Sequence, residues 1–335
     1  GRGDDHLKLT DIARLAGVSV TTASYVINGQ AAKRRISAAT VQRVLEVVEA
    51  HDYRPNTQAA GLRRGESRCL GFILPDLENP SYARLAKLLE QRARAAGYQL
   101  LIASSDDQPD SERQLLELFR SRRCDALIVA SCLPQDAPDY RQLVAAGTPV
   151  IAVDRALDPE HLYSVVSDDR QAGEQLTRSL VQPAQGHAAL IGARLELPIS
   201  QAREQGFREA LIGFDGLISV SHGEQFSRQW GYRQMKALLA KGGLPNVLVT
   251  TAYVLLEGVL DALHEHPELD TRTLRLGTFG DAQLLDFLPL RVNAISQQHE
   301  RIAERVFDRL LDALDGSYHP GLDAIERGLK IRFEP

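Results

Sequence analysis

Short apolar runs rich in β-branched residues alternate with amphipathic stretches along most of this chain, and the alternation occurs twice. The first set of apolar runs is 69–74, 98–103, 126–130 and 150–153, separated by amphipathic stretches such as 82–96 and 111–122. The second set is 188–191, 217–220, 247–249 and 274–278, with amphipathic stretches near 201–212, 229–239, 255–264 and 300–314. Strands that alternate with helices form parallel sheets covered by helices. We therefore predict an α/β fold with two doubly wound lobes.

Length and composition indicate a globular protein of more than one domain. The chain has 335 residues, and single hydrophobic cores stop growing near about 250–300 residues. Hydrophobic residues make up 44%, but no run reaches the roughly 18–20 apolar residues of a membrane helix. The cysteines Cys69, Cys124 and Cys132 show no Cys-x-x-Cys spacing, so we expect reduced thiols and no zinc site. These features predict a soluble, cytoplasmic protein without a metal or cofactor.

The net charge of −5 hides a division between the first fifth of the chain and the rest. Residues 1–68 hold eleven Lys/Arg and seven Asp/Glu, a balance of +4, whereas the remainder holds 28 and 37, a balance of −9. A basic segment is suited to a polyanion such as DNA, although many solvated helical faces are equally basic. The order of residues inside this segment has to decide between a DNA-binding domain and an ordinary solvated helical face.

That basic segment has the pattern helix, glycine turn, helix. Thr10 is predicted to cap a helix over 11–16 that ends at Gly17, and Ser19 to cap a second over 20–27 that ends at Asn28-Gly29. A third helix over 37–50 would close a core through Val41, Val44, Leu45 and Val48. A helix-turn-helix places its second helix in the major groove of DNA, so Val20, Thr21 and Tyr25 should meet base edges. The alternative is a small helical bundle without a DNA role.

Several motifs then carry a resemblance to a known family. Three motifs resemble the LacI/GalR family of bacterial repressors: Asp11-Ile-Ala-Arg-Leu-Ala-Gly-Val-Ser19, Tyr53-Arg-Pro-Asn56 and Ala59-Ala-Gly-Leu62. Within that family, five motifs are similar to the fructose-repressor branch: the basic insertion Lys33-Arg-Arg35 and the segments 20–29, 75–82, 105–110 and 286–288. The resemblance implies a homodimeric transcription regulator that binds double-stranded operator DNA. It also implies an effector, fructose 1-phosphate, with fructose 1,6-bisphosphate as an alternative.

The resemblance also implies a domain layout. Residues 1–6 are expected to be a tag remnant, 7–54 an all-α helix-turn-helix headpiece, 55–68 a hinge helix and linker, and 69–335 a two-lobe domain like the periplasmic sugar-binding proteins. Lobe 1 would comprise 69–166 and 298–322, and lobe 2 would comprise 167–296 and 324–335, with crossings near Ser167, Gln297 and Asp323. The hinge helix after Pro55 has barely two turns, and isolated helices need roughly 12–15 residues. It should form only when two copies pack on DNA.

The candidate DNA contacts follow from the helix-turn-helix and from the resemblance. In the family, a leucine at the place of Leu62 wedges into the operator from the minor groove, although an ordinary linker role is the alternative. The basic insertion and the arginines after the hinge are expected to contact phosphates. The candidates are Thr10, Ser19, Val20, Thr21, Thr22, Tyr25, Asn28, Lys33, Arg34, Arg35, Asn56, Ala59, Leu62 and Arg63.

The candidate effector site comes from the polar residues that follow the predicted strands. Ligands of open parallel sheets bind beyond the carboxyl ends of the strands, and guanidinium groups with hydroxyls and carboxylates suit a phosphorylated polyol. By resemblance the candidates are Ser81, Tyr82, Asp154, Arg155, Arg203 and Asp281. Asp154 capping a loop and Arg155 forming an interlobe salt bridge remain alternatives. The sequence departs from the family at Thr250-Thr251-Ala252 and at Gly280-Asp281-Ala282, which leaves the contacts from lobe 2 open.

Other function classes fit the sequence less well. We find no dinucleotide-binding glycine motif, no phosphate-binding Gly-Lys-Ser/Thr loop and no Gly-x-Ser-x-Gly, so we expect no catalytic residues and no enzyme activity. A sugar or sugar-phosphate receptor without a DNA role would suit the same two lobes. It would have no use for residues 8–62, and we expect such a receptor to carry a signal peptide, which we do not find.

Overall fold

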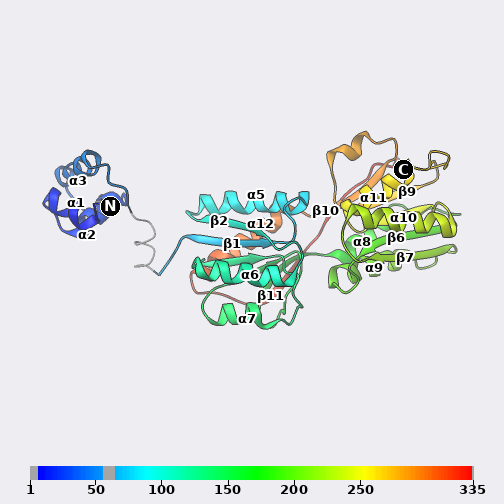
Figure 1. Cartoon of the computed structure of the whole chain (residues 1–335), viewed down its shortest axis with the longest axis horizontal. Coiled ribbons are helices and arrows are strands. Elements are labelled where there is room, and N and C mark those ends of the chain that lie inside the picture. The colour runs from blue at the N-terminus through cyan, green and yellow to red at the C-terminus, as the bar shows by residue number, and fades with distance from the viewer. Residues whose placement is uncertain (1–6, 56–64, 334–335) are drawn as a thin grey trace, which may run out of the picture. The chain divides into compact units, whose positions relative to one another are not determined.

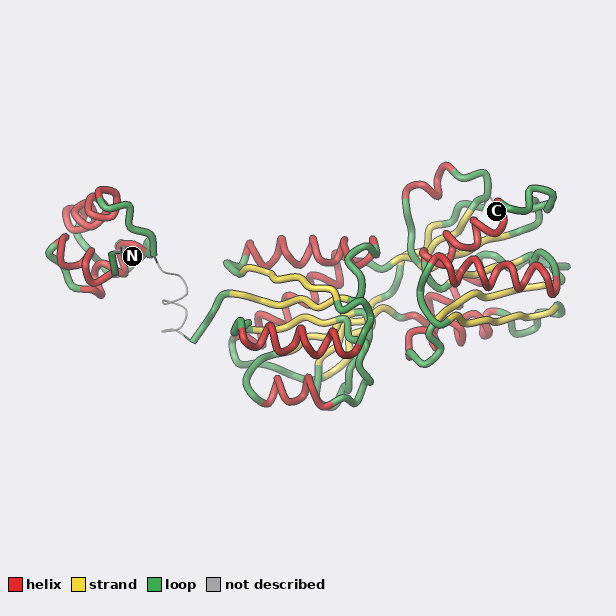
Figure 2. The backbone as a smooth tube through the Cα atoms, viewed as in Figure 1, coloured by secondary structure: helices red, strands yellow, loops and turns green. Residues whose placement is uncertain are grey.

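The structure, a computed structural model, describes residues 7–55 and 65–333. The chain divides after Ser67 into two compact units. Figure 1 labels the helices and strands of both units, and Figure 2 shows the same backbone coloured by secondary structure.

The first unit contains three helices, α1 (Leu9–Ala16), α2 (Val20–Ile27) and α3 (Ala38–Ala50). Gly17 has a left-handed φ of 66° and ends α1, because its amide donates back to the last turn and a residue without Cβ adopts this conformation at little cost. Ser19 caps α2 by accepting a hydrogen bond from the Thr22 amide at 3.1 Å. The core consists of Ile12, Ala16, Val26 and Val44. The predicted helix-turn-helix is confirmed.

Two predictions for this unit are wrong in detail. Thr10 does not cap α1, because the helix already begins at Leu9, and the Lys8 amide there donates to the Asp11 carboxylate at 2.8 Å. Leu45 is not in the core, because α3 turns it outward and leaves it 48% exposed. Val47, which the sequence analysis did not select, packs against the core together with Val41 and Val48.

The second unit contains two six-stranded sheets, and each one defines a lobe. The sheet of lobe 1 has the order β11-β5-β4-β3-β1-β2, and that of lobe 2 has the order β12-β10-β9-β8-β6-β7. All neighbouring strands are parallel except β10 and β12. The strands are β1 (Cys69–Leu74), β2 (Gln99–Ser104), β3 (Ala126–Val129), β4 (Val150–Val153), β5 (Tyr163–Ser167), β6 (His187–Ala193), β7 (Leu217–Gly223), β8 (Val247–Thr250), β9 (Arg275–Phe279), β10 (Val292–Ser296), β11 (Gly321–Ile325) and β12 (Gly328–Lys330).

Helices cover both faces of each sheet, and a separate hydrophobic core lies under each layer (Figure 1). In lobe 1 one face carries α5 (Pro80–Ala95) and α12 (His299–Leu314), and the other carries α6 (Pro109–Ser121) and α7 (Pro138–Ala145). In lobe 2 one face carries α10 (Arg228–Gly242) and α11 (Tyr253–His264), and the other carries α8 (Asp169–Arg178) and α9 (Pro198–Ala210). A 3₁₀ helix, η1 (Gln283–Phe287), follows β9. The two doubly wound lobes are confirmed.

The chain passes between the two sheets three times. The first passage follows Ser167 at the end of β5, and the second lies at Gln297 between β10 and α12. The third lies at 326–327 between β11 and β12, later than the predicted position at Asp323. Asp323 belongs to β11, where its carboxylate accepts a hydrogen bond from Arg305 of α12 at 2.9 Å and therefore stays with lobe 1.

The cysteines lie where the apolar runs predicted them. Cys124 and Cys132 are buried free thiols, and Cys69 is half-buried in β1. Burial raises the pKa of the Cys124 and Cys132 thiols to about 12, so both remain protonated at neutral pH.

Candidate DNA-contacting surface and ligand site

The N-terminal end of α2 presents most of the predicted base-contacting side chains. Val20 is 40% exposed, Thr21 is also exposed, and Tyr25 is half-buried on the next turn. Ser19 donates through its hydroxyl to Thr22 Oγ1 at 2.8 Å, which fixes both side chains at the start of the helix. These short side chains leave the end of α2 narrow enough to enter a major groove.

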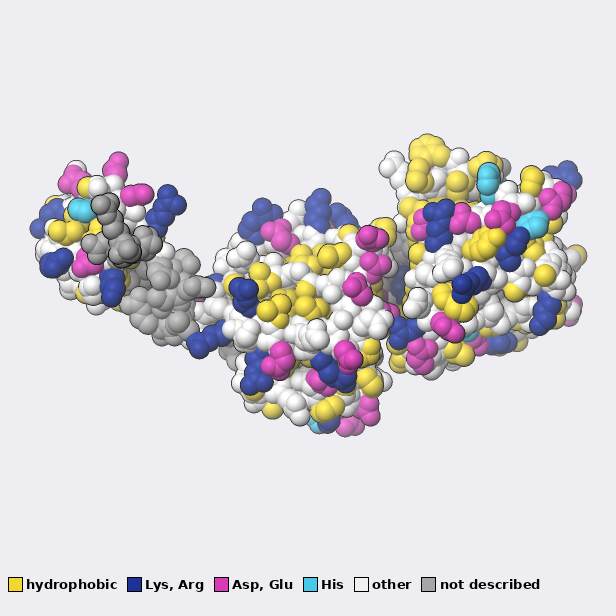
Figure 3. Space-filling model, in the orientation of Figure 1, with side chains coloured by type: hydrophobic (Ala, Val, Ile, Leu, Met, Phe, Trp, Pro, Cys, Tyr) yellow, Lys and Arg dark blue, Asp and Glu magenta, His cyan; other side chains and the backbone are white. Residues whose placement is uncertain are grey.

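The basic insertion forms a turn next to α2. The Gln30 amide donates to the Tyr25 carbonyl at 2.9 Å, and the Arg34 amide donates to the Gln30 carbonyl at 3.1 Å. Lys33, Arg34 and Arg35 are exposed, and the Arg34 guanidinium lies over the Tyr25 ring, 4.6 Å from its centroid. Lys and Arg side chains are visible on the surface of this unit in Figure 3. The contact between Arg34 and Tyr25 was not predicted from the sequence.

The remaining predicted DNA contacts divide into two groups. Thr10 and Asn28 are exposed in the first unit, Thr10 on α1 and Asn28 at the end of α2. Asn56, Ala59, Leu62 and Arg63 lie outside the described residues.

In the second unit, the predicted effector residues from α5 and β4 contact one another. Asp154 follows β4 in a left-handed conformation with φ 69° and is only 9% exposed. Its carboxylate accepts hydrogen bonds from the Tyr82 hydroxyl at 2.5 Å and from Gln297 Nε2 at 2.6 Å. Ser81, at the start of α5, lies 3.4 Å from Gln297 Oε1 and 2.8 Å from His299 Nε2. Gln297 therefore connects the predicted residues Ser81, Tyr82 and Asp154, although the sequence analysis gave it no ligand role.

Arg155 is held by a carboxylate that the sequence analysis did not assign to the site. Asp107 accepts from Arg155 at 2.6 and 3.4 Å, and the same carboxylate accepts from Arg194 of lobe 2 at 2.6 Å. The interlobe ion pair thus belongs to Asp107 and Arg194, whereas Arg155 pairs within lobe 1. Arg155 Nε is buried and has no hydrogen-bond partner among the described residues. The motif at 105–110, which is similar to the fructose-repressor branch, was the sequence feature that could have pointed to Asp107.

Arg203 lies in a second group of buried charges. Its guanidinium donates to the Thr251 carbonyl at 2.8 Å, lies 3.3 Å from the Asp169 carboxylate and stacks over the Phe279 ring at 4.8 Å. Arg327 donates to the same Asp169 carboxylate at 3.0 Å and lies 5.2 Å from the same ring. Asp169 and Arg327 were not predicted, because they come from α8 and from the third passage between the sheets.

Asp281 is not part of this group in the described residues. Its carboxylate accepts from Arg332 at 2.9 Å and from the Ala282 amide at 2.9 Å. Arg332 also pairs with Asp286 at 2.9 Å, so the contacts of Asp281 are with the C-terminal segment of lobe 2.

The charges around Asp154 keep it ionised. Burial alone would raise the pKa of this carboxyl, but Arg155, Arg203 and Arg327, together with the Tyr82 hydrogen bond, lower it below its ordinary value. Burial raises the pKa of the Tyr82 phenol, and the Asp154 charge adds to this rise, so Tyr82 remains a donor. We call the four arginines and three aspartates of this region the arginine–aspartate cluster: Arg155, Arg194, Arg203, Arg327, Asp107, Asp154 and Asp169. Glu196 also pairs with Arg194, so four carboxylates meet the four arginines, and an anionic ligand at Arg155 has to displace the Asp107 carboxylate.

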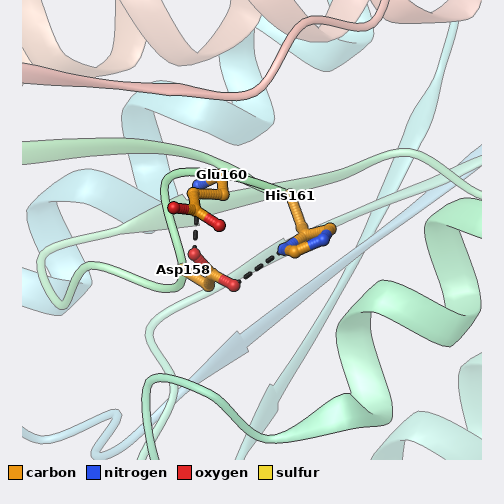
Figure 4. A group of neighbouring side chains, drawn as sticks. All are labelled: Asp158, Glu160 and His161. Atoms are coloured by element: carbon orange, nitrogen blue, oxygen red, sulfur yellow. Dashed lines mark hydrogen bonds and ion pairs between the residues drawn. The ribbon is translucent and has the colours of Figure 1, made fainter.

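A candidate metal site lies elsewhere in lobe 1. Among the described residues, Asp158, Glu160 and His161 are the group whose ligand atoms lie close enough to share an ion (Figure 4). Asp158 already accepts from the Glu160 amide at 3.0 Å, and its other oxygen lies 2.8 Å from His161 Nδ1. These are the contacts of a surface turn, and nothing in them requires an ion.

Comparison with known proteins identifies the family. Residues 67–264 match the family described as "Periplasmic binding proteins and sugar binding domain of LacI family", and residues 8–56 match "Bacterial regulatory proteins, lacI family". The chain belongs to the LacI family. Members of this family are DNA-binding transcription regulators and not enzymes. In the described part of this LacI-family chain, no helix is long and apolar enough to cross a membrane.

Similar LacI-family proteins include regulators named for fructose and for catabolite control. The chain is 50% identical over 326 residues to the fructose operon regulatory protein of Vibrio cholerae serotype O1, covering 97% of this chain and 100% of that one. It is 43% identical over 328 residues to the catabolite repressor/activator of Escherichia coli strain K12, covering 97% and 98%. The Cra transcriptional dual regulator of Pseudomonas putida, crystallised with fructose 1-phosphate, is 60% identical with a TM-score of 0.77, covering 80% of this chain and 99% of that one.

Proposed function

We propose that this LacI-family regulator binds a near-palindromic operator as a homodimer in the cytoplasm and leaves it when fructose 1-phosphate occupies the arginine–aspartate cluster. The observation that carries the proposal is the cluster itself, in which five of the seven side chains are buried and Arg155 Nε has no hydrogen-bond partner among the described residues. A phosphate has the charge and the acceptor geometry that guanidinium groups bind best. The relative solved with fructose 1-phosphate, at 60% identity, supports this choice of sugar phosphate.

Within this proposal, each predicted effector residue has a role. Arg155 and Arg203 grip the phosphate, and the Asp154 carboxylate accepts sugar hydroxyls. Ser81 and Tyr82 line the sugar from α5. Asp281 also accepts a hydrogen bond from a sugar hydroxyl. This hydroxyl replaces part of the contact between the Asp281 carboxylate and Arg332. A phosphate at Arg155 competes with Asp107, whose carboxylate holds that guanidinium in the structure.

The coupling to DNA follows from the domain layout. We assign residues 7–54 to the headpiece, 55–68 to the hinge and 69–335 to the effector-binding and dimerisation domain. An effector bound to residues of both lobes favours one arrangement of the lobes over another. That difference in affinity shifts the dimer away from the state in which two hinge helices pair on DNA. Leu62→Ala should then retain effector binding and weaken operator binding.

The alternatives differ in measurable ways. Fructose 1,6-bisphosphate carries a second phosphate, which would have to displace a further carboxylate, because all four arginines of the cluster pair with aspartates. A sugar-phosphate receptor without a DNA role is disfavoured by the match of residues 8–56 to the lacI family.

The test is isothermal titration of the full-length dimer with fructose, fructose 1-phosphate, fructose 6-phosphate and fructose 1,6-bisphosphate. We expect saturable binding of fructose 1-phosphate, weaker binding of the bisphosphate and no measurable binding of fructose. Arg155→Ala should abolish the preference for a phosphorylated sugar, while Arg113→Ala, which removes an exposed arginine of lobe 1, should not. Equal affinity for fructose and fructose 1-phosphate would overturn the proposal.

A further inference from the structure

The helices α8 and α9, which cover one face of the sheet of lobe 2, contact each other backbone to backbone (Figure 1). A methyl group on Gly173 of α8 would lie 2.6 Å from the Arg203 carbonyl oxygen of α9. One on Gly206 of α9 would lie 2.1 Å from the Arg170 carbonyl oxygen and 2.7 Å from the Glu174 amide nitrogen, both in α8. Each helix therefore places a glycine against the backbone of the other, close to Arg203.

Helix formation alone does not account for either glycine. Gly173 and Gly206 lie in the interior of their helices, where glycine is less favourable than alanine. Neither has the positive φ that makes glycine necessary at a turn. Both are buried, and the reason for glycine is the close approach of the two helix backbones, which a Cβ on either residue would prevent.

The contact between the helices fixes a buried ion pair of the arginine–aspartate cluster. Asp169 begins α8, and its carboxylate lies 3.3 Å from the guanidinium of Arg203 in α9. Gly173 follows Asp169 by four residues, so both lie on the side of α8 that faces α9. Arg203 is only 7% exposed, yet its Nε has no hydrogen-bond partner among the described residues. Because each charge belongs to its own helix, the separation of α8 and α9 sets the distance between them.

We propose that Gly173 and Gly206 are positioning residues of the effector site, because the close approach of α8 and α9 holds Arg203 where its guanidinium contacts the phosphate. This inference rests on the proposed function, in which Arg203 grips the phosphate, and it adds two residues that do not touch the ligand. Non-bonded atoms rest about 3.5 Å apart, so a methyl group on Gly173 has to move the Arg203 backbone by roughly 1 Å. Ligand-binding groups have to stay within roughly 0.5 Å of their working geometry, so this displacement weakens the grip.

Isothermal titration of the full-length dimer with fructose 1-phosphate tests the inference. Gly173→Ala should weaken binding about 10- to 100-fold, the range for lost hydrogen bonds to a charged group. Gly206→Ala should weaken binding in the same direction, because its methyl group meets the α8 backbone from the other side.

A matched control separates this effect from a general loss of stability. Gly258→Ala in α11 places a methyl group 2.0 Å from the Arg228 carbonyl oxygen of α10, which is the same kind of backbone contact. The helices α10 and α11 carry none of the proposed effector residues. Gly258→Ala should therefore lower the Tm as Gly173→Ala does and leave the affinity for fructose 1-phosphate unchanged.

A double-mutant cycle shows whether Gly173 acts through Arg203. Arg203→Lys keeps a positive charge on a flexible stem but removes the rigid fork, so binding is weaker and remains measurable. If Gly173 positions the fork, Gly173→Ala should cause little further loss in the Arg203→Lys background. A general loosening of lobe 2 would instead weaken binding by the same factor in both backgrounds.

Thermal unfolding shows whether each variant folds. If Gly173→Ala does not fold in plain buffer, the titrations of all variants are repeated at low temperature in sucrose, which favours the folded state.

The outcomes distinguish the positioning role from the proposed function. Unchanged affinity in Gly173→Ala, an equal loss in Gly258→Ala, or equal losses with and without Arg203→Lys would overturn the positioning role and leave the proposed function intact. Failure of the wild type to bind fructose 1-phosphate would overturn the proposed function, and the positioning role with it.

Discussion

Asp169 is the residue on which two buried arginines of lobe 2 depend. Its carboxylate lies 3.0 Å from Arg327 Nε and 3.3 Å from Arg203 Nε, and all three residues are less than 10% exposed. Removing one partner of a buried ion pair leaves an uncompensated charge, which costs far more than the pair contributes. The cluster is therefore a balanced set of charges and not a row of independent ligand contacts.

The first prediction concerns this balance. Asp169→Asn keeps the shape of the side chain and should lower the free energy of unfolding by about 3–5 kcal/mol. Urea unfolding followed by circular dichroism measures the loss. Asp270→Asn, which removes an exposed partner of Arg272, is the matched control and should leave the unfolding midpoint almost unchanged. A midpoint for Asp169→Asn equal to the wild type would show that the two arginines do not depend on this carboxylate.

His299, which contacts Ser81, gives a prediction about pH. Burial, together with the nearby Arg327 and Arg84 charges, lowers its pKa to about 4, and the Asp154 charge opposes this only in part. Below about pH 6.5 the unfolded chain binds a proton that the folded protein does not, so stability falls as the pH drops toward 4. Above pH 6.5 the His299 ring is neutral in the folded and the unfolded state, so this loss of stability is absent. Between pH 6.5 and pH 4 the loss grows to at most about 3 kcal/mol.

The variant His299→Gln isolates this effect. Between pH 7 and pH 4 the wild type should lose up to about 3 kcal/mol more unfolding free energy than the variant does, measured by urea unfolding at matched pH values. Parallel pH profiles for the two proteins would show that His299 does not titrate in this way.

Residue-level prediction from the sequence reached part of the candidate ligand site. Ser81, Tyr82, Asp154, Arg155 and Arg203 were selected because they follow strands or match family motifs. Tyr82, Asp154, Arg155 and Arg203 lie in the cluster or contact it, and Ser81 is connected to it through Gln297. Asp107, Asp169, Arg327 and Gln297 were not assigned to the site. Their contribution depends on which strands are neighbours and on where the chain changes lobes, and neither property is visible in a local pattern.

At the scale of elements, glycines set the distances between the helices of lobe 2. In the pair α10 and α11, a methyl group on Gly258 would lie 2.0 Å from the Arg228 carbonyl oxygen, and one on Gly231 would lie 2.3 Å from that of Leu255. Each helix thus places a glycine against the backbone of the other. The helices cannot move apart without exposing the core beneath them.

This packing predicts a contrast between two Gly→Ala variants of the same helix pair. Gly258→Ala should lower the free energy of unfolding by about 2–3 kcal/mol, because the contact is with backbone atoms that cannot move aside. Gly242→Ala, at the end of α10, meets only the His187 ring at 3.6 Å and should be neutral or slightly stabilising. Thermal melts of both variants provide the comparison, and similar Tm values would contradict the packing account.

The basic turn and α2 form one element of the candidate DNA-contacting surface. Arg34 supports the Tyr25 ring, whereas Arg35 is exposed beside it. On our proposal that Tyr25 contacts bases, Arg34→Ala should lower the ratio of operator affinity to affinity for unrelated DNA. Arg35→Ala should weaken binding to both DNAs by the same factor, because phosphate contacts carry no sequence information. Electrophoretic mobility shifts at fixed salt measure both affinities. An unchanged ratio in Arg34→Ala would show that Arg34 does not support base contacts by Tyr25.

Most elements were predictable from local patterns, and the exceptions have physical reasons. The long amphipathic helices gave clear periodicities, and most of the buried strands gave short continuous apolar runs. Strands β5, β10, β11 and β12 were not predicted. In β5 and β10 polar residues interrupt the apolar run although most of the strand is buried, and β11 and β12 are short edge strands with many exposed residues. Leu45 was placed in the core on periodicity alone, although three short helices around four buried side chains have little interior to offer.

At the scale of the molecule, the central feature is the cluster that joins the two lobes. Asp107 of lobe 1 accepts from Arg194 of lobe 2 and from Arg155 of its own lobe at the same 2.6 Å. An anionic ligand that takes over Arg155 changes the charges that hold the lobes together. This connects ligand binding to lobe arrangement through named residues, which is what an allosteric regulator requires.

The most direct test of the account is fluorescence anisotropy of a labelled near-palindromic operator at fixed salt, first titrated with the protein and then with sugar. We predict tight binding that fructose 1-phosphate reverses and fructose does not. The Arg155→Ala variant should bind the operator as tightly as the wild type and resist release. Tight binding that no sugar phosphate reverses, or release by fructose 1-phosphate that is unchanged in Arg155→Ala, would contradict the account.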